Sequence, residues 1–145
     1  MIIPYDSSLD SIALEFGKKM HKESRYSSLE FSKEKILNIL NHPNTYCAFS
    51  KTDKNITGFF IGFIQEFWFS KTNVGIDLAL YILPEYRART LCAVRLIKDF
   101  ERFCLERNCK EINLSSSAQI SENTALRLYS RLGYNKTGFI THKIL

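Results

Sequence analysis

The sequence predicts an α/β domain in which a mixed β-sheet carries helices on both of its faces. Apolar residues recur at helical spacing in several segments, and runs rich in aromatic and β-branched residues lie between them. The resulting order is two helices, three strands, a helix, a strand, a helix and a final strand. The succession of strand, helix and strand in this order predicts a parallel strand pair joined by a right-handed crossover.

The first two helices are predicted near the N-terminus. Apolar residues repeat at helical spacing over residues 9–20, after a short apolar start at residues 2–3 and N-cap candidates at residues 6–8. A polar break precedes the second helix. There Phe31 and Ile36 flank Ser32 at the spacing of a hydrophobic staple, which predicts Ser32 as the N-cap.

The next three elements are predicted to be strands. Residues 45–50 and 56–69 are rich in aromatic and β-branched residues and are separated by a polar turn. Gly58 and Gly62 in the second run indicate a bulge or a close approach of the backbone to a neighbour. Residues 74–83 are almost continuously apolar, which predicts a central strand that is covered on both faces.

The remaining elements complete the predicted order. Apolar spacing predicts a helix over about residues 91–108, a strand over 111–116 and a helix over about 121–132. Gly133 is suited to end this last helix. Residues 134–144 are predicted to form the last strand, with Gly138 as the position of a kink.

The composition indicates one globular domain spanning residues 1–145. Hydrophobic residues make up 45% of the chain and charged residues 24%, as in ordinary soluble proteins. The apolar run at residues 58–69 is too short to cross a bilayer, and the N-terminus lacks the pattern of a signal peptide. We therefore expect a cytoplasmic protein with no membrane partner.

The charge and the cysteines narrow the expected partners. A net charge of +5 suits an anionic ligand. The basic group Lys18, Lys19, Lys22 and Arg25 is explained by a solvated helix face, so nucleic acid is not expected as a partner. The four cysteines form no CxxC pair and have no histidine at zinc spacing, so we expect reduced thiols and no metal.

The segment at residues 77–97 has the pattern of an anion site. An apolar strand ends at Pro84, and a short basic loop leads directly into a helix. Backbone N–H groups at a helix N-terminus bind anions, and Arg87 and Arg89 would add bidentate phosphate donors. A phosphate-bearing ligand is one interpretation. An ordinary turn with solvated arginines is the other.

Two segments carry recognisable motifs: residues 87–92 (RARTLC) in the basic loop and residues 123–134 (NTALRLYSRLGY) in the last predicted helix. Both resemble motifs of the GNAT superfamily of acyl-CoA-dependent N-acetyltransferases. The first stands where the family has Gln/Arg-x-x-Gly-x-Gly/Ala, the loop that holds the coenzyme A pyrophosphate. The second is similar to the signature Asn-x-x-Ala-x-x-x-Tyr-x-x-x-Gly-Phe/Tyr, with the alanine one place early. The sequence of the central strand resembles a bacteriophage-type branch of the superfamily.

This resemblance implies a fold, a co-substrate and a set of binding residues. The fold would be a mostly antiparallel central sheet, flanked by helices on both faces, with a central splayed pair of parallel strands. Acetyl-CoA would be the co-substrate and an amine the acceptor. The residues implied beside acetyl-CoA are Leu80, Tyr81, Ile82, Arg87, Ala88, Arg89, Thr90, Leu91, Cys92 and Asn123.

Catalytic roles follow from the resemblance and from one isolated charge. By resemblance, Tyr129 is the general acid that protonates the departing thiolate. Asp77 is the only charge within residues 74–83, and we take it as the candidate base, acting through water. A carboxylate bonded to a backbone amide is the structural alternative, and Glu66 is the reserve base. No Cys–His or Ser–His pair has an evident role, which favours direct transfer in a ternary complex.

A second hypothesis comes from the phosphate loop. Both glycine positions of the family pattern hold other residues here, Thr90 and Cys92. A β-branched residue crowds the approach of phosphate oxygens to the backbone. The alternative is therefore a catalytically weakened GNAT-fold protein that acts by binding a partner protein or acyl-CoA.

The acceptor side is predicted only in outline. The loop after the first helix contains His21, Glu23, Tyr26 and Ser27, and we expect it to border the acceptor together with the aromatic run at residues 67–69. These residue types select neither a small molecule nor a protein as the primary amine. The same aromatic run suggests an edge through which a homodimer could form.

Overall fold

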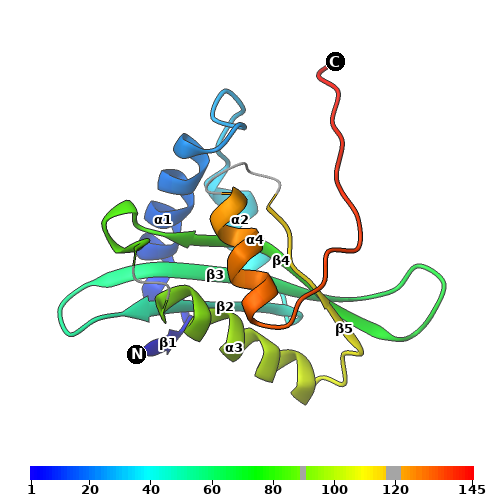
Figure 1. Cartoon of the computed structure of the whole chain (residues 1–145). Coiled ribbons are helices and arrows are strands. Elements are labelled where there is room, and N and C mark those ends of the chain that lie inside the picture. The colour runs from blue at the N-terminus through cyan, green and yellow to red at the C-terminus, as the bar shows by residue number, and fades with distance from the viewer. Residues whose placement is uncertain (89–90, 117–121) are drawn as a thin grey trace.

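The computed structural model describes residues 1–88, 91–116 and 122–145. Within these residues the chain forms one five-stranded sheet with the order β1-β2-β3-β4-β5 (Figure 1). Neighbouring strands are antiparallel except β4 and β5, which are parallel. The strands are β1 (Ile2–Pro4), β2 (Thr45–Lys51), β3 (Ile56–Glu66), β4 (Asn73–Ile82) and β5 (Glu111–Asn113). The predicted mixed, mostly antiparallel sheet is confirmed.

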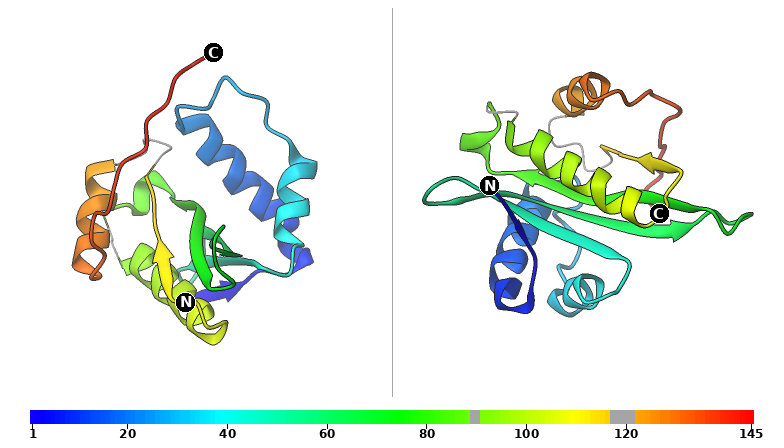
Figure 2. Two further views of the ribbon diagram at one scale, coloured as in Figure 1. Left: turned by 90° about the vertical axis from the view of Figure 1, so that its right-hand side faces the viewer. Right: turned by 90° about the horizontal axis from the view of Figure 1, so that it is seen from below.

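Helices cover both faces of this sheet, as predicted (Figure 2). One face is covered by α1 (Asp10–Glu23) and α2 (Lys33–Leu40), and the other by α3 (Leu91–Glu106) and α4 (Glu122–Arg131). Short 3-10 helices precede α1 (η1, Ser7–Leu9) and follow β4 (η2, Pro84–Tyr86). None of the helices in the described residues is long and apolar enough to cross a membrane.

Two aromatic cores form because side chains alternate between the faces of each strand. On β3, Phe59 packs against Phe16 and Phe49 under α1, whereas the next residue, Phe60, packs against Phe100 of α3. All five rings are almost fully buried. The sheet is therefore fixed between two independently packed helical layers, which hold β4 in a defined register.

Local sequence signals act as predicted at two positions. The hydroxyl of Ser32 accepts a hydrogen bond from the N–H of Lys35 at 3.3 Å, so Ser32 is the N-cap of α2. At Gly62, a Cβ atom would lie far inside van der Waals contact with the ring of Phe100. Glycine at this position therefore allows α3 to pack closely on β3.

Two terminal segments differ from the prediction. Residues 2–4 form β1, which pairs with β2, whereas only a short apolar start was expected. The last strand predicted at residues 134–144 is wrong: residues 135–145 have no regular structure. Gly133, with φ of 91°, ends α4, and the chain then runs away from the sheet as an extended arm (Figure 1). The arm exposes Phe139, Ile140, Ile144 and Leu145.

The missing last strand has a physical cause. A strand needs an edge to pair with, and β5 offers only the three residues Glu111–Asn113 instead of the predicted 111–116. The parallel pair therefore lies at one end of the strand order and not at its centre. Similarly, the predicted strand 56–69 ends at Glu66, because residues 67–72 make the turn into β4.

Candidate functional site

The two parallel strands separate part of the way along β4. Pairing between β4 and β5 covers only Val74–Ile76 and Glu111–Asn113. Beyond Ile76, β4 continues to Ile82, whereas β5 ends at Asn113. Pairing between the two strands stops at this point, and within the described residues the second half of β4 has no neighbouring strand on that side. We call this unpaired edge of β4 the splay.

A β-bulge lies at the start of the splay. Ile61 of β3 pairs with Ala79, but the next residue, Gly62, pairs with Asp77, so Leu78 is the extra residue on β4. Bulges change the direction of the side chains beside them and are frequent next to active sites. The bulge lies next to the boundary between the part of β4 that pairs with both β3 and β5 and the part that pairs with β3 alone, which carries Leu80, Tyr81 and Ile82.

Asp77 lies at the point where the strands separate. Its carboxylate accepts a hydrogen bond from the backbone N–H of Ser115 at 2.9 Å. Burial raises the pKa of Asp77 to about 6, although the hydrogen bonds from Ser115 oppose that shift. A carboxylate with this pKa is ionised at neutral pH and is basic enough to accept a proton. The hydrogen bond from Ser115 also matches the structural alternative, in which Asp77 serves to bind a backbone amide.

Tyr129 reaches the same residue from α4. Its hydroxyl donates a hydrogen bond to the carbonyl oxygen of Ser115 at 3.1 Å. Burial, and secondarily the nearby charge of Asp77, raises the pKa of Tyr129. The phenol therefore stays protonated at neutral pH and keeps a proton to donate. The backbone of Ser115 thus contacts both predicted catalytic residues. The sequence gives no signal for this role, because a backbone N–H and C=O are present in almost every residue.

Glu66, the reserve base, lies elsewhere. It is exposed at the end of β3, where it pairs with Asn73, the first residue of β4. Asp77 lies four positions further along β4, beside Ser115. The geometry therefore favours Asp77 over Glu66 as the base.

The predicted phosphate loop is described only in part. Arg89 and Thr90 lie outside the described residues, whereas Leu91 and Cys92 form the first turn of α3. The thiol of Cys92 accepts a hydrogen bond from the hydroxyl of Thr57 at 3.6 Å. Ala88 is exposed, and so is Asn123 in the first turn of α4. After β4 the chain passes through η2, and α3 begins at Leu91.

Arg87 is held by the protein itself. Its Nε atom donates to the carbonyl oxygen of Ile82 at 2.9 Å, and its terminal nitrogen forms an ion pair with Glu23 at 2.7 Å. The guanidinium also lies over the ring of Tyr81, 5.3 Å from its centroid. Sequence reasoning expected a solvated or phosphate-bound arginine and missed Glu23 as its partner, because the two residues are far apart in the chain.

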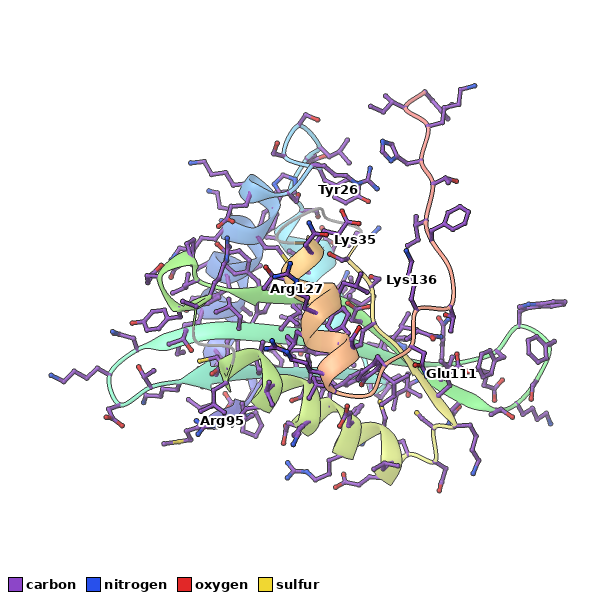
Figure 3. The ribbon with its side chains drawn as sticks, in the orientation of Figure 1. Tyr26, Lys35, Arg95, Glu111, Arg127 and Lys136 are labelled. Carbon is purple, nitrogen blue, oxygen red and sulfur yellow. The ribbon has the colours of Figure 1, made fainter. Side chains whose placement is uncertain are left out.

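The acceptor side shows one grouping and one correction. Glu23 is the last residue of α1, and His21 lies two positions before it. Tyr26 follows in the loop between α1 and α2 (Figure 3). Within the described residues, Nε2 of His21 is buried and has no hydrogen-bond partner. Trp68 and the neighbouring Phe69 do not join this group. They are exposed at the tip of the β3–β4 hairpin, which projects away from that loop (Figure 1).

The described residues contain no group of side chains suited to bind a metal ion. Among residues 1–88, 91–116 and 122–145, no three His, Cys, Asp or Glu side chains are placed to share an ion. The four cysteines are free thiols.

The sequence profile of the Acetyltransferase (GNAT) family matches residues 9–134. The chain belongs to the GNAT acetyltransferase family. It is an acetyltransferase, and the matched residues include Asp77, Ser115 and Tyr129. A search of curated proteins found no match to the chain.

Solved structures confirm the GNAT fold along the whole chain. An aminoglycoside acetyltransferase from an uncultured soil metagenomic sample has a TM-score of 0.78 at 13% identity, covering 100% of this chain and 97% of that one. The ribosomal-protein-alanine N-acetyltransferase of Brucella melitensis biovar Abortus 2308 has a TM-score of 0.75 at 13% identity, covering 100% and 99%. AAC(6')-Iy, solved with the bisubstrate analogue CoA-S-monomethyl-acetylneamine, has a TM-score of 0.75 at 17% identity, covering 100% and 97%.

Proposed function

We propose that residues 1–145 form one domain that transfers the acetyl group of acetyl-CoA to a primary amine by direct attack in a ternary complex. The observation that carries this proposal is the arrangement of Asp77 and Tyr129 around Ser115 at the splay of β4 and β5. A carboxylate that is ionised at neutral pH and a protonated phenol, both in contact with Ser115, can serve as the base and the acid of acyl transfer to an amine.

The proposed reaction begins with proton removal. Asp77, acting through water, takes a proton from the acceptor, and the neutral amine nitrogen attacks the thioester carbonyl. A C–N bond forms and the C–S bond breaks. Tyr129 donates its proton to the departing sulfur, and the extra proton that the attacking nitrogen carries after the C–N bond has formed passes through water to the Tyr129 phenolate. The products are the amide and the thiol of CoA. Backbone N–H groups of residues 80–82 would stabilise the oxyanion, because β5 provides no partner for this part of β4.

The cofactor would lie along the splay with its diphosphate at the start of α3. The proposed contacts are with Leu80, Tyr81, Ile82, Arg87, Ala88, Arg89, Thr90, Leu91, Cys92 and Asn123. The positive end of the α3 dipole favours a negative group at this position. The solved relative with a CoA-based bisubstrate analogue supports acyl-CoA as the co-substrate.

The acceptor is proposed as a primary amine on a small molecule or a protein. The structural relatives named above include enzymes for aminoglycosides and for a ribosomal protein, so both acceptor classes occur among similar folds. The free thiols suit a reducing cytoplasm, where we place the reaction. We also propose that the chain belongs to a bacteriophage-type branch of the family, which the sequence of its central strand resembles.

A second candidate function is supported by the phosphate loop alone. Thr90 and Cys92 replace the two family glycines, so the protein could have kept the fold and lost turnover. In that case it would bind acyl-CoA or a partner protein. Thr90→Gly combined with Cys92→Gly discriminates between the two functions: a modest gain in acyl-CoA affinity supports the cofactor site. No gain, together with capture of a stoichiometric protein partner, supports the alternative.

We also propose a homodimer formed through the β3–β4 hairpin. Trp68 is 95% exposed and Phe69 is 67% exposed at its tip, where their rings contact each other. Large aromatic side chains exposed together favour association. Light scattering should give a dimer mass that Trp68→Ser with Phe69→Ser reduces to a monomer, and a wild-type monomer mass would contradict the proposal.

Calorimetric titration with acetyl-CoA tests the main proposal. We expect stoichiometric binding and an increase in the melting temperature at saturating ligand. If wild-type protein binds no acyl-CoA, the proposed function is wrong.

A further inference from the structure

Three side chains connect the end of α1 to the end of β4. The two carboxylate oxygens of Glu23 are both occupied: Oε1 accepts from the hydroxyl of Tyr81, and Oε2 accepts from Arg87 at 2.7 Å. Arg87 is held in turn by the carbonyl of Ile82 and by the ring of Tyr81. We call Glu23, Tyr81 and Arg87 the latch.

The latch residues come from elements on both sides of the proposed site. Glu23 is the last residue of α1, which continues into the loop on the acceptor side. Tyr81 lies near the end of β4, with its ring in the aromatic core under α1. Arg87 follows η2 and is the first residue of the proposed diphosphate loop. A change at Arg87 would therefore act on α1 through a single ion pair.

The ionised state of Glu23 supports its ion pair with Arg87. Burial alone would raise the pKa of Glu23, but the hydrogen bonds from Tyr81 and Arg87 and the charge of Arg87 together lower it. The carboxylate is thus ionised at neutral pH and neutralises the guanidinium. Arg87 is already paired in the free protein and has to change partners to bind a phosphate group with its full charge.

We propose that Glu23 and the diphosphate of acyl-CoA are alternative partners for Arg87, an inference that rests on the proposed function. Arginine binds carboxylate and phosphate with the same planar set of donors, so the two anions compete. The ion pair is partly exposed, with 28% of the Arg87 side chain and 34% of the Glu23 side chain accessible, so it can open without disturbing the core. Glu23 is therefore a positioning residue that lowers the affinity for the cofactor.

Exchange of partners would also link the two substrates. When the diphosphate takes Arg87, Glu23 keeps its hydrogen bond with Tyr81 and loses the guanidinium that neutralises its charge in the free protein. This charge lies at the start of the loop that borders the acceptor side, where it would attract a cationic amine. The latch therefore predicts ordered binding, with acyl-CoA before the amine.

A purely structural role makes the opposite prediction. If Glu23 serves only to anchor α1, its removal loosens the fold near the site and lowers or leaves unchanged the affinity for the cofactor. If it competes with the diphosphate, its removal raises that affinity. The sign of the change separates the two roles.

The test is a double-mutant cycle in which calorimetry measures the dissociation constant for CoA. Glu23→Gln keeps a group that can bond Tyr81 but removes the competing charge, and we expect it to tighten CoA binding roughly two- to fivefold, the range for a partly exposed ion pair. In the Arg87→Ala background the same change should have no effect. Glu15→Gln is the matched control, because Glu15 lies on the same helix and, among the described residues, forms its ion pair with Lys19.

The outcomes are distinguishable. Unchanged or weaker CoA binding by Glu23→Gln, or equal tightening in both backgrounds, overturns the latch while the proposed function stands. Absence of CoA binding by the wild-type protein overturns both. If Glu23→Gln does not fold, Glu23→Asp replaces it: its shorter side chain reaches Arg87 poorly and should also tighten binding, and unchanged or weaker binding again overturns the latch.

Discussion

Asp77 and Tyr129 bind opposite polar groups of one residue: the carboxylate of Asp77 accepts the N–H of Ser115, and the phenol of Tyr129 donates to its carbonyl oxygen. The two side chains come from β4 and α4, which are far apart in the sequence. Ser115 thereby holds both groups beside the splay. At neutral pH the Asp77 carboxylate is ionised and can accept a proton, and the Tyr129 phenol, whose pKa is raised, is protonated. The predictions below separate these roles from structural ones.

Acetyl transfer should depend on the ionisation of Asp77. Its pKa is raised to about 6 and the base must be ionised, so kcat/KM should fall as the pH is lowered through about 6. Asp77→Asn should reduce turnover by roughly 10²- to 10⁴-fold and remove this limb of the profile. A wild-type profile without this limb, or a variant that retains it, would show that another group is the base.

The same carboxyl should reduce stability at neutral pH. The folded-state pKa lies above the ordinary value of 3.8, so folding favours the protonated form, and this contribution is lost as the pH rises through about 6. Urea unfolding at pH 4 and pH 7.5 should show that Asp77→Asn gains up to about 3 kcal/mol relative to wild type between these pH values. An equal difference between the two proteins at both pH values would contradict this account.

Tyr129→Phe should slow the reaction more than it affects binding. Loss of the acid should lower kcat by roughly 10²-fold or more, while the dissociation constant for CoA changes little. Stability should fall by about 1 kcal/mol through loss of the hydrogen bond to Ser115.

Tyr134→Phe is the control for this variant. Its hydroxyl donates to Glu101 at 2.9 Å, and its ring lies beside that of Tyr129. It should therefore lose similar stability and keep its turnover. Equal kinetic effects of the two substitutions would assign Tyr129 a packing role only.

Gly62→Ala should test how closely α3 packs on β3. The new methyl group would overlap the ring of Phe100, so the helix or the ring must move, and we expect a loss of about 1–3 kcal/mol in urea unfolding. Gly138→Ala in the C-terminal arm, where a Cβ meets nothing within 4 Å, should leave stability unchanged. Similar effects at both positions would mean that the close contact is not a constraint.

The sequence predicts those parts of the fold that have a local signal. The long helices carry apolar residues at helical spacing, β2, β3 and β4 are marked by their aromatic, β-branched and apolar content, and Ser32 has the signal of an N-cap. β1 is too short for a period to be seen, and it forms only because it pairs with β2, far along the chain. The last predicted strand has an apolar pattern but meets no sheet edge long enough to pair with.

The sequence likewise predicts some residues of the candidate site and misses others. Asp77 is visible in the sequence as an isolated charge, and Tyr129 as part of a motif. The role of Ser115 depends on backbone atoms, and the pair of Glu23 with Arg87 joins residues 64 positions apart. Neither has a sequence signal, because each arises only when the helices pack onto the sheet.

A crystal structure of the protein with bound CoA tests the central claim most directly. The account predicts that the diphosphate lies at the start of α3, in contact with the backbone of residues 87–92, and that the sulfur lies in the splay within hydrogen-bonding distance of the Tyr129 hydroxyl. A complex in which the diphosphate contacts neither that backbone nor Arg87, and the sulfur lies away from Tyr129, would contradict it.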